Sequence, residues 1–145
     1  ETAGLVLFSV NPDTRGLYHE LFTRGEVEKT YEALAHMDQP PAERRWMIEN
    51  RIERGEPRFR MRIVPGVANA RSVIDLMEVS GNRAHFRLHP ITGKTHQLRV
   101  HMQAMGHGVV GDALYGSSDA NERLLLHAFR LEVTGPAPGG RADTN

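Results

Sequence analysis

One segment of the sequence, residues 89–101, concentrates side chains that could do chemistry. It reads His-Pro-Ile-Thr-Gly-Lys-Thr-His-Gln-Leu-Arg-Val-His, and its second half has helical spacing. Arg99 in this segment could bind a carboxylate or a phosphate through two parallel hydrogen bonds, a strong arrangement where water is excluded. The alternative interpretation is a surface arginine whose partner is solvent. Residue types alone leave both interpretations open.

Three other kinds of site fit the sequence poorly. Gly93-Lys94-Thr95 resembles the end of a phosphate-binding loop, but that motif needs a glycine five residues before Gly93, where Leu88 stands. Five histidines lie between residues 85 and 107, yet the chain contains no HExxH zinc motif. No serine occupies a GxSxG turn, and the chain has no cysteine. We therefore expect no phosphate loop, no metal site and no serine nucleophile.

Charge is distributed unevenly along a chain whose formal net charge is zero. Residues 79–111 contain no Asp or Glu but four Arg or Lys side chains and five histidines. Residues 43–62 contain seven Arg against four Glu. A neutral total argues against a strongly nucleic-acid-binding chain. Each basic stretch is therefore either a solvated face or a local binding surface, and the sequence leaves this choice open.

The elements that must position these side chains follow from hydrophobic patterning. Strands are predicted over residues 4–10, 27–37, 58–64, 73–79, 83–91 and 124–133, the first of them buried. Residues 27–37 also allow a helix. Helices are predicted from a cap at Asp13 to Thr23 and from a cap at Thr95 to a left-handed residue at Gly106. Residues 42–54 indicate a surface helix or a loop. The expected fold is α+β, with a mixed, mainly antiparallel sheet and a few flanking helices.

Length and composition predict one domain. A chain of 145 residues, 39% of them apolar, fits a single hydrophobic core, which we assign to residues 1–134, with a tail at 135–145. No apolar run approaches the roughly 20 residues of a membrane span, and the acidic start lacks the features of a signal peptide. We expect a cytoplasmic protein without a membrane partner.

Four stretches of the chain resemble, in the same order, the motifs of the RluA-type RNA pseudouridine synthases. Residues 89–116, HPITGKTHQLRVHMQAMGHGVVGDALYG, are similar to the family block TGRTHQIRVH...GHPIVGD..YG, departing mildly at Lys94, Leu98 and Gly108-Val109. Residues 1–8 resemble the end of HRLDRxTSGLLLFA, residues 29–34 resemble K-x-Y-x-A-L, and residues 123–128 resemble RLALHA. The resemblance implies the pseudouridine synthase catalytic fold with its front portion missing.

The resemblance also implies an activity, the isomerisation of uridine in RNA without a cofactor. In this family an aspartate carboxylate promotes detachment of uracil from ribose, and the base rotates and reattaches through C5. Tyr31 matches the tyrosine that stacks on the target base, and Arg99 matches the arginine that pairs with the aspartate. The motif that carries the aspartate falls immediately ahead of Glu1. We therefore expect this chain, as given, to be inactive.

Other residues take expected roles from the same resemblance. Lys94, His96 and Gln97 are expected to touch the RNA backbone or the aspartate loop. Leu125 and Leu126 stand where the family places a leucine against the base pocket, and alternation lets only one of them face it. His101 and His127 are expected to be packed core histidines, and Asp112 is expected to have a structural role in its turn.

The expected partner is ribosomal or transfer RNA. An alternative is a non-enzymatic RNA-binding module that uses the basic surface of residues 79–111. A third possibility is that a chain with too few core strands associates through exposed sheet edges.

Overall fold

The computed structural model of the protein describes residues 2–116 and 122–135. These residues form a seven-stranded sheet in the order β1-β7-β2-β6-β5-β3-β4, with two helices. In chain order the elements are β1 Ala3–Gly4, α1 Pro12–Thr23, β2 Val27–His36, β3 Arg45–Arg54, β4 Met61–Val64, β5 Ala70–Ser80, β6 Arg83–Pro90, α2 Gln97–Ala104 and β7 Leu126–Val133. Only β1 pairs in parallel, with β7. The predicted mixed, mainly antiparallel α+β fold is confirmed.

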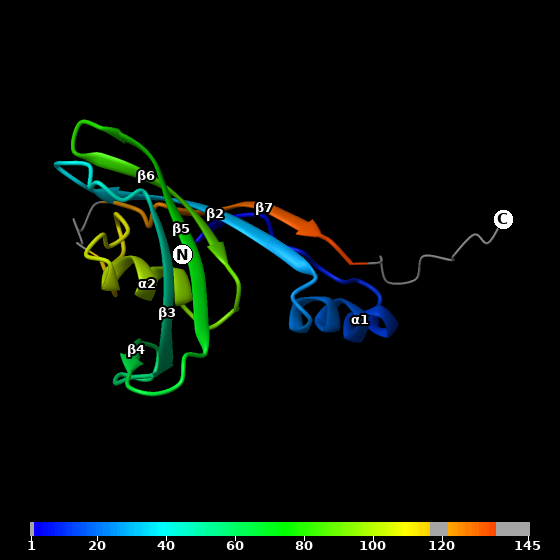
Figure 1. The fold of residues 1–145 in the computed structure, drawn as a ribbon. Coiled ribbons are helices and arrows are strands. Elements are labelled where there is room, and N and C mark those ends of the chain that lie inside the picture. The colour runs from blue at the N-terminus through cyan, green and yellow to red at the C-terminus, as the bar shows by residue number, and fades with distance from the viewer. Residues whose placement is uncertain (1, 117–121, 136–145) are drawn as a thin grey trace.

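The core lies between the sheet and α2 (Figure 1). Ala84, Phe86 and Leu88 alternate along β6 and are fully buried, so the face predicted to pack does pack. Leu98 and Met102 of α2, one helical turn apart, cover this face. Burying a leucine or phenylalanine side chain contributes about 1.5–3 kcal/mol, which fixes α2 on the sheet. Other members of this core are Ala33, Ala35, Met37, Ile74, Leu76, Val109 and Leu126.

A smaller cluster joins the far end of the sheet to the same helix. Ile52 of β3 and Val100 of α2 pack there with Ala70 and Tyr115. Within the sheet, β4 pairs only with β3, and it lies at the end of β3 below α2 (Figure 1). α1 lies apart from α2, near the ends of β2 and β7 (Figure 1). α2 therefore packs on the sheet through both clusters, whereas no residue of α1 belongs to either of them.

The predicted buried strand at residues 4–10 is wrong. Only Ala3–Gly4 pairs with β7, and the last backbone bond there runs from the Leu5 N–H to the Ala128 carbonyl. The side chains of residues 5–8 are between 47% and 81% exposed. Gly4 adopts φ +117, where a Cβ would meet the backbone of Ala128, and the chain leaves the sheet after it. No described element covers these apolar side chains.

The expectation of a helix or loop at residues 42–54 is also wrong, because residues 45–54 form β3 between β5 and β4. Trp46, Ile48 and Ile52 turn toward the core, but Met47 lies on the exposed face between them. The polar Asn50 occupies an inward position. Because position 47 is apolar but exposed and position 50 is polar but faces inward, apolar and polar residues do not alternate regularly along β3. The strand was therefore not predicted.

Both helices were predicted, but their caps were not. Asn11 caps α1 by accepting a hydrogen bond from the Asp13 N–H at 3.0 Å, and Pro12 fills the first helical position. α2 begins at Gln97, and His96, at φ 53, takes the cap position in place of Thr95. The exposed strand predicted at 58–64 is shorter, as β4, and the predicted tail lies outside the described residues except for Gly135. No described helix is long and apolar enough to cross a membrane.

Candidate active site

A cavity of about 570 Å³ lies where β2, the end of β6, the loop before α2 and β7 meet. Residues proposed from the sequence line it, namely Tyr31, Lys94, His96, Gln97, Arg99 and Leu126. Leu125 does not line this cavity. It is exposed just before β7, where it lines a separate cavity together with Glu32. Of the two candidate leucines, Leu126 is therefore the one that reaches the 570 Å³ cavity.

Tyr31 stands in the middle of the sheet. It pairs with Leu88 of β6 on one side and with Ala128 of β7 on the other, next to a register shift after Thr30. Burial raises the pKa of the Tyr31 hydroxyl, because ionisation is disfavoured away from water. At neutral pH the side chain is therefore a planar apolar ring with a protonated polar tip, suited to stacking and to donating one hydrogen bond.

Lys29 is a cavity residue that was not among the predicted site residues. It lies two residues before Tyr31 on β2, so both side chains are on the same face of the strand. Burial lowers the pKa of the Lys29 ammonium group. The family's K-x-Y spacing could have indicated Lys29 as a site residue, because the first and third residues of such a stretch lie on the same face of a strand.

Arg99 has a carboxylate partner within the chain. Its Nε donates to Asp112 Oδ2 at 2.7 Å, and its Nη2 donates to Asp112 Oδ1 at 2.6 Å. The Arg99 side chain is 13% exposed and that of Asp112 is fully buried. From the sequence, Arg99 was expected to lack its carboxylate partner, and Asp112 was expected to have a structural role. The fold brings the two side chains together, because the tight turn that carries Asp112 begins five residues after the end of α2.

The turn around Asp112 holds this carboxylate in place. Asp112 Oδ1 also accepts hydrogen bonds from the N–H groups of Leu114 and Tyr115, at 3.0 and 3.1 Å. Burial alone would raise the pKa of Asp112, but the hydrogen bonds from Arg99 and these two N–H groups outweigh it, so the pKa is lowered. The hydrogen bonds to Asp112 likewise raise the pKa of Arg99. Both groups are charged at neutral pH.

Arg99 keeps part of its hydrogen-bonding capacity. The two bonds to Asp112 use Nε and Nη2, and among the described residues Nη1 has no partner. The guanidinium also lies over the Tyr115 ring, with Cζ 5.1 Å from the ring centroid. Asp112 and Tyr115 therefore fix the orientation of Arg99 while one donor edge stays available beside the 570 Å³ cavity.

His96 connects the cavity to Tyr115. Its Nδ1 lies 2.9 Å from the Tyr115 hydroxyl, which also accepts a hydrogen bond from the Met61 N–H at 2.6 Å. Burial and the nearby Arg99 charge lower the pKa of His96. The imidazole is thus neutral at neutral pH. In the tautomer whose Nδ1 accepts the Tyr115 hydroxyl proton, Nε2 carries the ring proton and is the donor available to a ligand.

Gln97 is buried and satisfied on both sides of its amide. Its Oε1 accepts from the Thr92 hydroxyl at 2.6 Å and from the Lys94 N–H at 3.0 Å. Its Nε2 donates to the Arg71 carbonyl at 2.7 Å and to Ser72 Oγ at 2.9 Å. The structure therefore places Gln97 as the anchor of the loop that carries Lys94 and His96.

His101 continues this polar network, whereas His127 does not lie where it was expected. His101 is fully buried, with Nδ1 2.9 Å from Ser72 Oγ and Nε2 3.0 Å from Asn50 Oδ1. Burial lowers its pKa to about 4. His127 is exposed because the alternation that turns Leu126 inward turns its neighbour outward. The packed position predicted for His127 is therefore wrong.

The basic surface predicted from residues 79–111 is largely neutralised. Arg87 Nη2 lies 3.2 Å from Glu32, and Arg83 Nη2 lies 2.5 Å from Glu122. His85 lies 3.5 Å from Glu32, and His89 lies 3.8 Å from Asp75. These side chains share the outer face of the sheet, away from α2. Among the described residues, no three His, Asp or Glu side chains gather closely enough to hold a metal ion.

Comparisons with known proteins identify the family of this chain. Residues 1–104 match the family described as RNA pseudouridylate synthase. The dual-specificity RNA pseudouridine synthase RluA of Haemophilus influenzae is 31% identical over 147 residues, covering 95% of this chain and 65% of that protein. RluA of Escherichia coli K12 is 54% identical over 61 residues, covering 40% of this chain and 28% of that protein.

A solved structure shows the same fold. The human RNA pseudouridylate synthase domain containing 1 superposes with a TM-score of 0.71 at 31% identity, covering 86% of this chain and 56% of that one. This chain therefore spans less than two thirds of the length of these relatives.

Proposed function

This chain belongs to the RNA pseudouridylate synthase family, and from this premise we propose that it is the part of an RNA pseudouridine synthase that holds the target uridine. The observation that carries the proposal is the convergence of Tyr31, Arg99 and Leu126 on the 570 Å³ cavity, which we call the uridine cavity. The three come from β2, α2 and β7, so only the folded chain brings them together. The proposed substrate is ribosomal or transfer RNA, and the proposed location is the cytoplasm.

Each of these side chains suits one part of the isomerisation. The protonated Tyr31 ring stacks on the flipped uracil, and Leu126 supplies an apolar wall opposite polar groups of the base. Arg99 presents Nη1 to a carboxylate, which a fixed cation keeps ionised. Lys94 and the Nε2–H of His96 are donors for a neighbouring phosphate. The chain thus contributes base recognition and one charged partner for the catalytic acid.

We propose further that the 145-residue chain does not turn over uridine by itself. Among the described residues that line the uridine cavity there is no aspartate or glutamate. Asp112 is the carboxylate nearest to Arg99, but both of its oxygens are bonded and its side chain is buried. This supports a catalytic carboxylate from the family's HRLD motif, which the 145 residues do not contain.

The test compares pseudouridine formation in bulk RNA by this chain and by a form extended upstream through the expected HRLD motif. We expect activity from the extended form only, and its loss when the motif's aspartate becomes alanine. Tyr31→Phe in the extended form should lower the rate about 100-fold, because it keeps the ring and removes the polar tip. Turnover by the 145-residue chain would mean that one of its own carboxylates is the catalytic acid. Inactivity of both forms would favour an RNA-binding module.

A further inference from the structure

The arginines of this protein fall into two groups according to their partners. Most of those described form ion pairs with carboxylates, namely Arg24, Arg45, Arg51, Arg71, Arg83, Arg87, Arg99 and Arg130. Of the seven other described arginines, Arg15, Arg44 and Arg123 lie elsewhere in the chain, and four lie within nine residues, at 54, 58, 60 and 62, all exposed. In the described structure none of these four has a carboxylate oxygen within 4.0 Å. We call residues 54–62 the arginine hairpin.

The tip of the arginine hairpin also exposes an aromatic ring. Phe59 stands between Arg58 and Arg60 with 62% of its surface exposed. Backbone hydrogen bonds from Gly55 N–H to the Arg60 carbonyl, at 2.7 Å, and from Arg60 N–H to the Pro57 carbonyl, at 2.8 Å, close the turn. An exposed ring among arginines that have no carboxylate partner in the described structure offers both interactions that a single-stranded nucleic acid uses, base stacking and phosphate contact.

The arginine hairpin is attached to the candidate active site. Arg60 Cζ lies 5.6 Å from the centroid of the Tyr115 ring, the ring that also receives Arg99. The Met61 N–H bonds to the Tyr115 hydroxyl, which in turn contacts His96 of the uridine cavity. A groove of about 490 Å³ runs between β4 and α2, lined by Arg60, Arg62 and Tyr115 among others. Arg60, whose Nη2 donates to the Leu114 carbonyl, therefore places the arginine hairpin one aromatic ring away from Arg99.

We propose that the arginine hairpin binds a single-stranded segment of the same RNA that presents the target uridine. Arg54, Arg58 and Arg62 contact its phosphates, and Phe59 stacks on an unpaired base. That the ligand is RNA rests on the proposed function. The exposed ring favours RNA over an acidic protein, since carboxylates would satisfy the arginines but would give Phe59 no planar partner.

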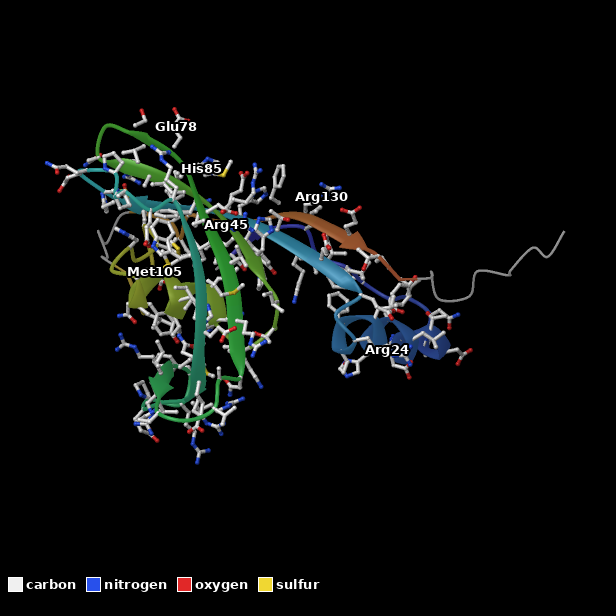
Figure 2. All side chains as sticks on the ribbon, in the orientation of Figure 1. Arg24, Arg45, Glu78, His85, Met105 and Arg130 are labelled. Atoms are coloured by element: carbon white, nitrogen blue, oxygen red, sulfur yellow. The ribbon has the colours of Figure 1, made fainter. Side chains whose placement is uncertain are left out.

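The experiment measures binding of a fluorescein-labelled RNA stem-loop to the 145-residue chain by fluorescence anisotropy between 50 and about 200 mM salt, the range over which phosphate contacts dominate. The test variant is Arg54→Gln/Arg58→Gln/Arg62→Gln. The control, Arg24→Gln/Arg45→Gln/Arg130→Gln, removes the same charge from exposed arginines that have carboxylate partners. Figure 2 labels these three just after α1, at the start of β3 and on β7, away from β4. Arg60 is left unchanged because it contacts Tyr115.

The test variant should weaken binding at least about tenfold and lower the slope of log Kd against log salt by about 2, since each phosphate contact on a single strand contributes about 0.7. The control should change Kd less than about twofold. Phe59→Ala should weaken binding about tenfold without changing the slope. Circular dichroism establishes that each variant is folded.

Equal effects of the test and control variants would overturn the proposal, as would the absence of measurable RNA binding by the unaltered chain. An unchanged Kd for Phe59→Ala would overturn the stacking contact. If poly-glutamate binds as tightly as RNA and depends equally on the three arginines, the partner is an acidic protein and the proposal fails. Pseudouridine formation by the extended form is a separate readout, so a hairpin that does not bind RNA and a chain that is no synthase give different results.

Discussion

The Arg99–Asp112 pair sets the position of a guanidinium beside the uridine cavity. Asp112→Asn keeps the shape of the side chain but leaves the mostly buried Arg99 charge without a counter-charge. We expect the free energy of unfolding, measured by urea titration at pH 7, to fall by about 3 kcal/mol. Arg130→Gln is a suitable control, because it removes an exposed pair with Glu132 and should cost less than about 1 kcal/mol. Equal losses in the two variants would contradict this account of the pair.

The same pair gives an acid-side pH dependence. Because the folded pKa of Asp112 is lowered, its stabilising contribution is complete above the unfolded value of 3.8 and is lost as the pH falls through the folded value. This loss lies below pH 4. It should be absent from Asp112→Asn.

His101 predicts a pH dependence in a separate window. Its pKa is lowered from 6.5 to about 4, so between these values the unfolded chain binds a proton that the folded chain does not. Stability is therefore complete above pH 6.5, falls as the pH decreases toward 4, and loses about 3 kcal/mol in total. Urea titrations at pH 7.5, 6 and 5 should show this slope, and His101→Gln should flatten it. A slope unchanged by that substitution would assign the effect to other groups.

At the scale of elements, the sequence predicted what depends on local patterns. The hairpin of β5 and β6 was found because small and large apolar residues alternate with basic ones, and α2 was found because Leu98 and Met102 are one turn apart. β3 was missed because Met47 and Asn50 break its alternation. The residues of the uridine cavity came from a family resemblance. The Arg99–Asp112 pair did not, since it depends on a turn geometry that no local pattern records.

The loop before α2 owes its position to one side chain. Gln97 bonds the loop at Thr92 and Lys94, and β5 at Arg71 and Ser72. Gln97→Leu keeps a similar volume and leaves these groups unpaired, at a cost of about 1 kcal/mol or more for each that stays buried. We expect faster hydrogen exchange at the Lys94 amide. Gln103→Leu, an exposed change on the same helix, should leave that amide unchanged, and equal acceleration in both would show that Gln97 is not the anchor.

At the scale of the whole molecule, two surfaces differ in kind. The arginine hairpin exposes charged side chains to solvent. The segment at residues 5–8 instead exposes four apolar side chains in succession, next to a short β1. A contiguous apolar surface of this kind favours association, because covering it removes its area from water. The two surfaces should therefore respond oppositely to salt, which weakens phosphate binding and strengthens apolar contact when the salt is sulfate.

This difference predicts concentration-dependent self-association of the chain through residues 5–8. Sedimentation velocity at a few and at some tens of micromolar, a range typical for such exposed surfaces, should show larger species at the higher concentration and more of them in sodium sulfate. Val6→Lys/Phe8→Lys should shift the chain to monomer, because two charges in the contact would have to be desolvated. Val67→Lys is the matched control, since Val67 is 84% exposed but lies in a different loop, and it should leave association unchanged. A chain that stays monomeric throughout, or one that both variants affect equally, would show that this segment does not drive association.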